Sequence, residues 1–345
     1  MTDRPGPGFG RSPVAAPSDG PPVLDDAIAA ALLPERSVRG HKGSFGKLLV
    51  IAGSLDYAGA ALLVARSAGR AGVGHVTLAV PESLQPLFAA RVVEATTLAL
   101  PEDDVEEVEP EDALARILDH DHDALVLGPG LRPGLATTEL IRSLLAMPAD
   151  EESGPPVLLD AEALRSLATI DHWWEGVRRA AVLTPHAGEF DRLRAAGGGE
   201  PGADGDLIDD DAARAAATTD AAHAWGQVVV LKGARTVIAS PTGQVSVAPF
   251  ENPAMASAGT GDVLSGTIGS LLAQGIAPFD AARLGVYLHG LAGEAVRARI
   301  GDAGLLASDL IDELPFARRR LSLIRERGSG RRVGFASRAE DPGAG

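Results

Sequence analysis

The chain lacks cysteine altogether across its 345 residues. Disulfides, thiolate nucleophiles and cysteine-based zinc or iron–sulfur sites are therefore excluded. Targeting and spanning segments are absent as well. Residues 1–22 hold no apolar stretch of signal-peptide length, and no run elsewhere is long and apolar enough to cross a bilayer. These absences predict a cytoplasmic protein.

Positive charge is scarce. The chain has 31 Lys and Arg against 47 Asp and Glu, which gives a formal net charge of −16. Such a surface repels phosphodiester backbones and anionic lipids, so neither nucleic acid nor a membrane is expected as a partner. A negatively charged nucleotide would have to be held by local groups, because the overall field opposes it.

Apolar patterning is missing at both ends of the chain. Residues 1–23 and 326–345 are rich in Gly, Pro and polar residues, and we expect them to be disordered tails because they cannot bury enough surface to offset chain entropy. Residues 195–213 are rich in Gly and Asp and predict a solvated loop. Hydrophobic residues make up 45% of the chain, which is enough for one large core and predicts a single catalytic domain over 24–325.

Between the tails, short β-rich runs alternate with Ala-rich helical segments. The β-rich runs stand at 48–53, 75–80, 92–100 and 124–130. Three further buried-strand runs, at 156–164, 181–190 and 228–234, each lead into polar or Gly residues. Helices are expected at 135–147, 261–275 and 279–299, and the last two are expected to close the domain. Residues 236–240 and 244–250 predict an antiparallel strand pair. The alternation predicts an α/β sandwich with a mainly parallel sheet, in which ligands gather at the carboxyl ends of the strands.

A glycine-rich helix start gives the sharpest signal for a site. Residues 258–262 read Ala-Gly-Thr-Gly-Asp and lead into a helix with one apolar stripe. The turn at Gly259, Thr260 and Gly261 leaves free backbone N–H groups at the positive end of the helix dipole, which predicts an anion site. Asp262 lies in the first helical turn and is either a dipole-neutralising cap or a catalytic base. The adjacent glycines favour the base, because they cost stability unless something must approach the backbone closely.

Three further strand ends carry polar residues. Lys232, Gly233, Ala234, Arg235 and Thr236 follow one strand run. A lysine at this place either holds a phosphate as a point charge or is an ordinary strand-end cation. His186 and Glu189 follow another run, as satisfied polar residues or as ligands for substrate or metal. Asp160 and Glu162 form an acidic pair after a third.

Three other patterns are weaker than they look. Residues 40–47 have the wrong spacing for a P-loop and precede their strand. Residues 119–123 alternate Asp and His, but they also precede their strand, at the end opposite the proposed site, and predict a solvated turn. Residues 128–134 miss the dinucleotide fingerprint by one residue and form either a rigid loop or a pocket wall. Trp173 and Trp174 are expected to be packing residues.

The ordered set of segments HKGSFGK, LGPGL, LLDAEAL, LTPHAGE, VLKGART and NPAMASAGTGDVLSG resembles one family. That family is the ADP-dependent NAD(P)H-hydrate dehydratases of the ribokinase-like superfamily. The match runs from about His41 to Glu294, and the pairing of LTPHAGE with NPAMASAGTGD is its most specific part. The resemblance implies a ribokinase-like three-layer α/β/α sandwich. It also implies ADP-dependent dehydration of the S-epimer of hydrated NADH or NADPH (NADHX or NADPHX), with AMP and phosphate as by-products.

The resemblance implies roles for individual residues. It implies contacts to the hydrated dinucleotide from Ala60, Gly130, His186 and Asp262. It implies contacts to the adenine nucleotide from Lys232, Gly233, Ala234, Arg235, Thr236 and Gly261. Asp262 would be the general base, with ADP as co-substrate and Mg²⁺ as cofactor, the latter helped by Glu189. A homotetramer is expected, together with a separate epimerase, because the segment before His41 is too short for an epimerase domain.

The sequence departs from the family at three positions, and two other functions remain as alternatives. Family members usually have Gly at positions 254 and 258 and Pro at 187, where this chain has Ala254, Ala258 and Ala187, so loops near the ligand are narrowed. A ribokinase-like kinase for a small vitamin alcohol such as hydroxyethylthiazole would share the anion site and the Asp base. His186 speaks against it, because such kinases commonly have Asn there. A non-catalytic nucleotide-binding regulator would not need Asp262.

Overall fold

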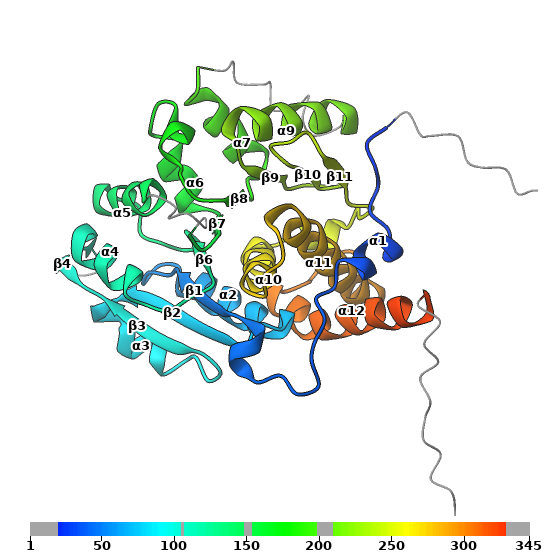
Figure 1. Ribbon diagram of the computed structural model, residues 1–345, viewed down its shortest axis with the longest axis horizontal. Helices are drawn as coiled ribbons and strands as arrows, with labels where there is room; N and C mark the ends of the chain where they lie inside the picture. Colours follow the sequence, from blue (N-terminus) through cyan, green and yellow to red (C-terminus); the bar gives the residue numbers. More distant parts are fainter. Residues whose placement is uncertain (1–19, 105–106, 148–153, 199–209, 329–345) are drawn as a thin grey trace, which may run out of the picture.

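A nine-stranded sheet forms the middle of the molecule. The computed structural model describes residues 20–104, 107–147, 154–198 and 210–328. The strand order is β11-β10-β9-β8-β7-β6-β1-β2-β3 (Figure 1). Neighbours from β3 to β9 pair in parallel, whereas β10 pairs antiparallel with both β9 and β11. The predicted mainly parallel sheet with one antiparallel pair is confirmed.

The strands of the sheet are short, and all except the edge strand β3 are largely buried. The sheet consists of β1 (Lys47–Ile51), β2 (His75–Pro81), β3 (Thr96–Leu100), β6 (Ala124–Leu127), β7 (Val157–Leu159), β8 (Ala181–Leu183), β9 (Val228–Leu231), β10 (Val237–Ala239) and β11 (Val245–Val247). A separate hairpin is formed by β4 (Glu102–Asp104) and β5 (Glu107–Val108).

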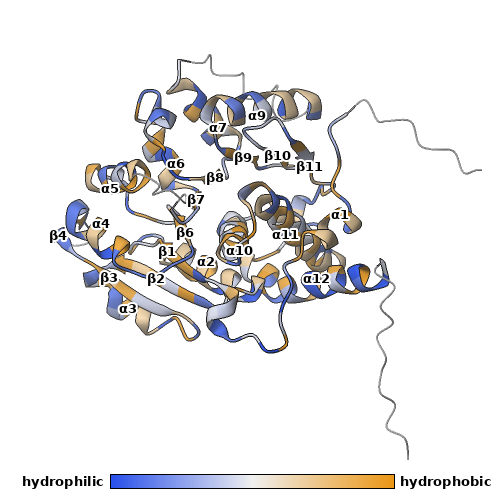
Figure 2. Cartoon of the chain, in the orientation of Figure 1, coloured by the Kyte–Doolittle hydropathy of each residue, from blue (hydrophilic) through white to orange (hydrophobic). Residues whose placement is uncertain are grey.

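Side chains of each strand alternate between two apolar layers. On β1, Leu48 and Val50 face one layer, and Leu49 and Ile51 face the other. Figure 2 shows hydrophobic residues along the strands. Parallel strands have to be connected by crossovers, so helices cover both faces. The result is the predicted three-layer α/β/α sandwich.

The helices divide between the two faces (Figure 1). One layer contains α1 (Asp26–Ala31), α2 (Ala58–Ala71), α3 (Gln85–Ala89), α10 (Thr260–Ala273), α11 (Pro278–Ile300) and α12 (Ala307–Gly328). The other contains α4 (Pro110–Leu118), α5 (Leu135–Ala146), α6 (Glu162–Leu167), α7 (Ala187–Ala195) and α9 (Asp211–Trp225). Among the described residues, no helix has both the length and the apolarity needed to span a membrane.

Glycines set how closely α10 approaches its neighbours. A Cβ added at Gly266 would lie 2.1 Å from Ser67 Oγ and 2.3 Å from the carbonyl oxygen of Val64, both on α2. A Cβ at Gly269 would lie 2.3 Å from Val126 Cγ2 on β6. The helix is therefore wedged between α2 and the sheet, and this contact fixes where its first turn lies.

Three helices close the domain, whereas the sequence predicted two. After α10 and α11, α12 buries Leu310, Ile311, Leu314 and Leu321 against the domain. These residues have helical spacing, but Pro315 stands among them. A proline inside a periodic pattern usually ends a helix, which is why the sequence did not predict this one.

The predicted loop over 195–213 ends earlier than expected. The α9 helix begins at Asp211, and the side chain of Asp210 accepts hydrogen bonds from the amides of Ala212 and Ala213. The run of aspartates is thus partly an N-cap, as the acceptor preference of this position favours. Residues 199–209 lie outside the described part of the chain.

The edges of the predicted domain lie close to 24–325. Val23 bridges Val247 in parallel, and the Leu24 amide donates to the Val247 carbonyl at 2.8 Å. At the other end α12 continues to Gly328. The remaining tail residues, 1–19 and 329–345, are outside the described residues, and the single-domain boundaries stay a prediction.

Substituting Gly266 by Ala is expected to destabilise the protein by about 1–3 kcal/mol, because the new methyl group collides with α2 backbone that cannot move aside. Gly69→Ala is the matched control. Gly69 is an exposed helical glycine with nothing within 4 Å of an added Cβ, so the change should leave stability unchanged or raise it by about 0.5–1 kcal/mol. Denaturant unfolding of both variants measures this. Equal stability of the two would show that α10 and α2 are not in close contact.

Candidate active site at the carboxyl edge of the sheet

Polar residues of four segments meet where the parallel strands end. Asp160 follows β7, His186 follows β8 and Lys232 follows β9. The first turn of α10, which contains Asp262, is the fourth segment. The sequence prediction that these strand ends share one edge is confirmed by the parallel pairing of β7, β8 and β9.

A buried ion pair lies at the centre of this edge. Lys232 Nζ donates to Asp160 Oδ1 at 2.8 Å and lies 3.8 Å from Glu189 Oε2. The Asp160 side chain is only 3% exposed, and its second oxygen accepts from Ser265 Oγ at 2.6 Å. Burial works to lower the pKa of Lys232, but the charges of Asp160 and Glu189 outweigh it, so the pKa is raised and the ammonium stays protonated.

The first turn of α10 offers unpaired amides. Gly259 is the N-cap in the left-handed region, at φ 86°, and no side chain caps the helix. Within the described chain, the N–H groups of Gly261 and Asp262 have no acceptor. A Cβ at Gly261 would lie 3.6 Å from Lys232 Nζ, so these amides and the ammonium face the same space. Together they supply the donors that the predicted anion site requires.

Asp262 has a shifted pKa. Burial raises the pKa of its carboxyl to about 7, and the negative charge of Asp160 acts in the same direction, while the positive charge of Lys232 opposes both. A carboxylate that titrates near neutral pH matches the requirement for a general base. Within the described residues, the oxygens of Asp262 accept no hydrogen bond. The geometry therefore does not support the alternative in which Asp262 caps the helix through backbone amides.

His186 and Glu189 form a reciprocal cap at the start of α7. The Glu189 amide donates to His186 Nδ1 at 3.3 Å, and the His186 amide donates to Glu189 Oε2 at 2.9 Å. The His186 side chain is 55% exposed, whereas that of Glu189 is 9% exposed. The cap holds the imidazole at the edge with more than half of the side chain exposed, so its structural role leaves the ring accessible.

A cavity of about 560 Å³ opens beside the lysine, between β9, β10, α10 and α11. Lys232, Gly233, Ala234 and Thr236 line it, as do Thr260 and Gly261, which puts most of the predicted nucleotide residues around one hollow. Phe250, Met255, Leu264 and Val286 supply its apolar wall.

Arg235 differs from its neighbours in that segment. It is not among the residues that line the cavity. Its Nε lies 2.5 Å from Asp211 Oδ2, and a second guanidinium nitrogen lies 3.8 Å from Glu251 Oε1. The first ion pair ties the loop after β9 to α9, and the second ties it to the segment after β11.

Ala60 and Gly130 lie together at the neighbouring strand ends. Gly130 has φ 66°, and a Cβ there would lie 2.9 Å from the Cβ of Ala60 and 2.7 Å from the carbonyl oxygen of Tyr57. Ala60 lies in the first turn of α2, which runs beside α10, and a Cβ on Gly259 would touch Leu63 of the same helix. The loop 128–134 is thus both a tight turn and a wall of the edge.

Sequence reasoning missed two contributors. Ser265 orients Asp160, but in the sequence it is only a small residue on the helix that follows the Gly-Thr-Gly turn. His289 on α11 was set aside, yet its Nε2 lies 2.9 Å from the Thr260 carbonyl oxygen and its ring lines the cavity. Burial lowers the pKa of His289 to about 4, so the neutral ring donates to that carbonyl. The signal was the distance between α10 and α11, which a single sequence does not contain.

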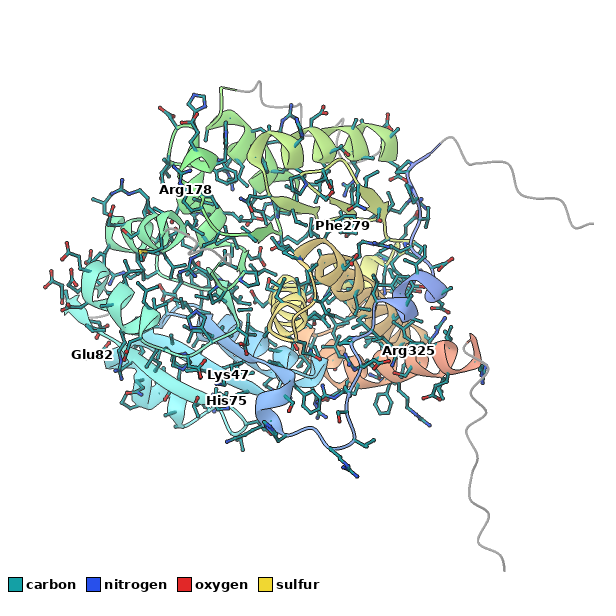
Figure 3. All side chains as sticks on the ribbon, in the orientation of Figure 1. Lys47, His75, Glu82, Arg178, Phe279 and Arg325 are labelled. Carbon is teal, nitrogen blue, oxygen red and sulfur yellow. The ribbon has the colours of Figure 1, made fainter. Side chains whose placement is uncertain are left out.

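Two of the weaker patterns, residues 40–47 and 119–123, lie at the other edge of the sheet. The Lys47 amide donates to Asp123 Oδ2 at 2.8 Å, and the Lys47 ammonium contacts Asp121. Lys47 and His75 begin β1 and β2, and Figure 3 labels both at this amino edge. Trp173 is buried, and its ring packs against Trp225 with 5.1 Å between centroids, which confirms the packing role.

Magnesium fits this edge only as an ion carried by phosphates. In the described residues, no three His, Cys, Asp or Glu side chains group as ligands. Mg²⁺ usually takes one or two carboxylates and completes its shell with phosphate oxygens and water. Asp262 and Glu189 are carboxylates of that kind beside the cavity, so they are the residues that would hold it.

The family model described as NAD(P)H-hydrate dehydratase matches residues 48–316. The chain belongs to the NAD(P)H-hydrate dehydratase family. The resemblance noted in the sequence is therefore confirmed, and its motifs from LGPGL onward lie at the carboxyl edge, whereas HKGSFGK lies at the amino edge. None of the three departures of this dehydratase-family chain, Ala187, Ala254 and Ala258, adopts a positive φ, so each methyl group fits without backbone strain.

Two relatives with assigned names illustrate the family. A bifunctional NAD(P)H-hydrate repair enzyme of Moorella thermoacetica is 41% identical over 301 residues, which cover 87% of this chain and 54% of the relative. The chain thus spans about half the length of that relative. An ADP-dependent (S)-NAD(P)H-hydrate dehydratase of Neisseria meningitidis is 35% identical and is covered over 90% of its own length.

Solved structures support the same fold. An ADP/ATP-dependent NAD(P)H-hydrate dehydratase of Bacillus subtilis, co-crystallised with ATP and Mg²⁺, superposes with a TM-score of 0.72 at 32% identity. The alignment covers 88% of this chain and 100% of that one. A ribokinase-like superfamily protein of Enterococcus faecalis has a TM-score of 0.71 at 22% identity, over 90% of this chain and 99% of that one, which speaks for the fold alone.

His289 is expected to remain neutral across the working pH range. Its pKa near 4 means that the ring gains a second proton only in acid, and that Nε2 keeps the hydrogen given to Thr260. Imidazole ¹⁵N chemical shifts followed from pH 8 to pH 5 should not move. A midpoint between pH 6 and 7 would show that the ring is solvated and does not hold the α10 turn.

Proposed function

We propose that this protein dehydrates the S-epimer of hydrated NADH and NADPH to NADH and NADPH, with ADP as the co-substrate that becomes AMP and phosphate. The observation that carries the proposal is Asp262, which has a pKa near 7 and stands beside free helix amides and a protonated lysine. This arrangement places a base and a phosphoryl site side by side. The name of the Neisseria relative supports the same reaction.

The base acts on a hydroxyl. Hydrated NADH has a hydroxyl group on a saturated ring carbon, and hydroxide is a poor leaving group. Asp262 accepts the hydroxyl proton while that oxygen attacks the β-phosphorus of ADP, and the bond from that phosphorus to the bridging oxygen of AMP breaks. The ring nitrogen then expels phosphate, and loss of a proton from the adjacent carbon restores the dihydronicotinamide.

The anion site stabilises the transferring group. The amides of Gly261 and Asp262 and the ammonium of Lys232 face the phosphoryl oxygens, which is where charge develops. Asp160 and Ser265 keep the ammonium in place. Magnesium bound through Asp262 or Glu189 would neutralise further charge on the diphosphate when present.

Binding residues follow from the same edge. We propose that Lys232, Gly233, Ala234 and Thr236, with the α10 turn, hold the nucleotide in the cavity, and that Ala60, Gly130 and His186 hold the hydrated ring. Arg235 would act through its ion pairs with Asp211 and Glu251, by shaping the loop. The relative from Bacillus was crystallised with ATP, so ATP is a second candidate donor.

A kinase for a small vitamin alcohol is the alternative, since a hydroxyethylthiazole kinase shares the fold with a TM-score of 0.54 at 15% identity. We further propose that the protein works in the cytoplasm as a homotetramer. A separate epimerase would supply the S-epimer. Such coupling fits the bifunctional name of the Moorella relative.

The direct experiment mixes the protein with hydrated NADH, ADP and Mg²⁺ and follows dihydronicotinamide absorbance together with AMP and phosphate. The proposal expects equal amounts of all three products. ADP production from ATP with hydroxyethylthiazole, and no NADH, would support the kinase. No ligand-dependent turnover at all would support a regulator.

Asp262→Asn is expected to lower kcat by about 10²–10⁴-fold, because the amide cannot accept the proton. Ionised Asp262 is disfavoured in the folded protein at pH 8, above its raised pKa, so the neutral Asn should leave the melting temperature equal or higher there. ADP affinity should remain close to wild type. A variant that unfolds would instead make Asp262 a structural cap.

The pH dependence of kcat/KM is expected to follow the Asp262 carboxyl. Only the ionised form is a base, so the rate should fall about tenfold per unit below pH 7 and level off above it. Asp160→Asn removes a negative neighbour and should move the midpoint to lower pH. An acid limb near pH 4 in the unaltered protein would mean that another group is the base.

A further inference from the structure

We call the cavity beside Lys232 the nucleotide cavity. A second hollow lies on the other side of Lys232 and Glu189 from it. It is a groove of about 1080 Å³ along α5, α6 and α7, and we call it the α5–α7 groove. Its lining includes His186 and Glu189, and then continues away from the sheet edge to Arg192, Arg165 and Thr169. It shares no lining residue with the nucleotide cavity, but the two come together where Glu189 lies 3.8 Å from Lys232.

The groove lies where the non-reacting part of a bound dinucleotide would extend. If ADP fills the cavity beside Lys232, the hydrated ring has to reach Asp262 from the other side. The rest of the dinucleotide then extends past His186. Arg192 lies six residues further along α7, which is about 9 Å at 1.5 Å per residue. In a dinucleotide one ribose separates the ring from the diphosphate, so the diphosphate comes near this arginine.

The charges in the groove favour an anion although the chain carries −16 overall. Arg165 is paired with Glu162 at 3.4 Å, and the Glu189 carboxylate is occupied by its cap. Arg192 is exposed and has no ion-pair partner among the residues that the structure describes. A guanidinium of this kind is the side chain best suited to a diphosphate, which it binds through two parallel hydrogen bonds.

Hydroxyl groups complete the groove. Thr138 Oγ1 donates to the Gly134 carbonyl at 3.0 Å, and Thr169 Oγ1 donates to the Ser166 carbonyl at 2.7 Å. Since each hydroxyl has used its proton, its oxygen still accepts a hydrogen bond. Ribose hydroxyls are donors that fit such acceptors.

We propose that the α5–α7 groove binds the adenosine diphosphate half of the hydrated dinucleotide, with Arg192 on the diphosphate. This rests on the proposed function. It assigns the two adenylate groups of the reaction to separate hollows, ADP on the α10–α11 side and the dinucleotide on the α5–α7 side. Arg192 is thus a binding residue that acts on the non-reacting part of the substrate.

Truncated substrate tests the groove. Arg192→Ala is compared with Arg194→Ala, a neighbour on α7 that does not line the groove and whose guanidinium lies 5.8 Å from the Phe190 ring centre. Both are assayed with hydrated NADPH and with hydrated reduced nicotinamide riboside, which lacks the diphosphate and the adenosine. Arg192→Ala should raise KM for hydrated NADPH about tenfold or more, the loss expected of one charge-assisted hydrogen bond, with kcat and the KM for ADP unchanged. The KM for the hydrated riboside should not move, and Arg194→Ala should match wild type.

Equal KM increases for both substrates, or none for either, would overturn the groove assignment. Direct binding separates this from failure of the dehydratase reaction. With the nucleotide cavity filled by ADP, calorimetry with NADPH as the probe should give about tenfold weaker binding for Arg192→Ala than for Arg194→Ala. If that difference appears without turnover, the groove stands and the proposed reaction falls. If NADPH binds both variants equally, the groove is not its site.

Discussion

The buried ion pair between Lys232 and Asp160 is the interaction on which the rest of the site depends. Removing two charges from water is costly unless each finds good partners, and both do here. Asp160 has the ammonium on one oxygen and the Ser265 hydroxyl on the other, and the ammonium has Glu189 nearby. The pair joins the ends of β7 and β9 across β8, and Ser265 ties both to α10. The positions of these charges are thereby fixed by strands and a helix.

One consequence is that Asp160 and Asp262, which both lie near Lys232, behave differently. Both oxygens of Asp160 accept hydrogen bonds. Asp262 accepts none within the described structure, and the negative charge of Asp160 helps to raise its pKa. Burial makes the ionisation of Asp262 harder, and the negative charge of Asp160 adds to this. The same fold thus supplies a fixed cation and a base that titrates near neutral pH, as phosphoryl transfer from a nucleotide to a hydroxyl requires.

Much of this arrangement was predictable from local patterns. Parallel strands with polar residues after them predicted the active edge, and the Gly-Thr-Gly turn predicted free amides beside Asp262. The parts that failed depend on contacts between distant segments. Ser265 reads as a small residue of a packing stripe until Asp160, 105 positions away, is known to face it. His289 has no sequence partner because its acceptor is a backbone carbonyl on another helix. In α12, Pro315 obscured a helix whose apolar spacing was otherwise regular.

The central claim is that Asp262 is a buried carboxyl poised to accept a proton near neutral pH. The most direct measurement is the titration of its side-chain carbon by ¹³C NMR, with the signal assigned by its absence in Asp262→Asn. The account predicts a midpoint near 7 in the ligand-free protein. A midpoint near 4, the ordinary value of an exposed aspartate, would contradict it, because Asp262 would then be solvated and apart from the charge of Asp160.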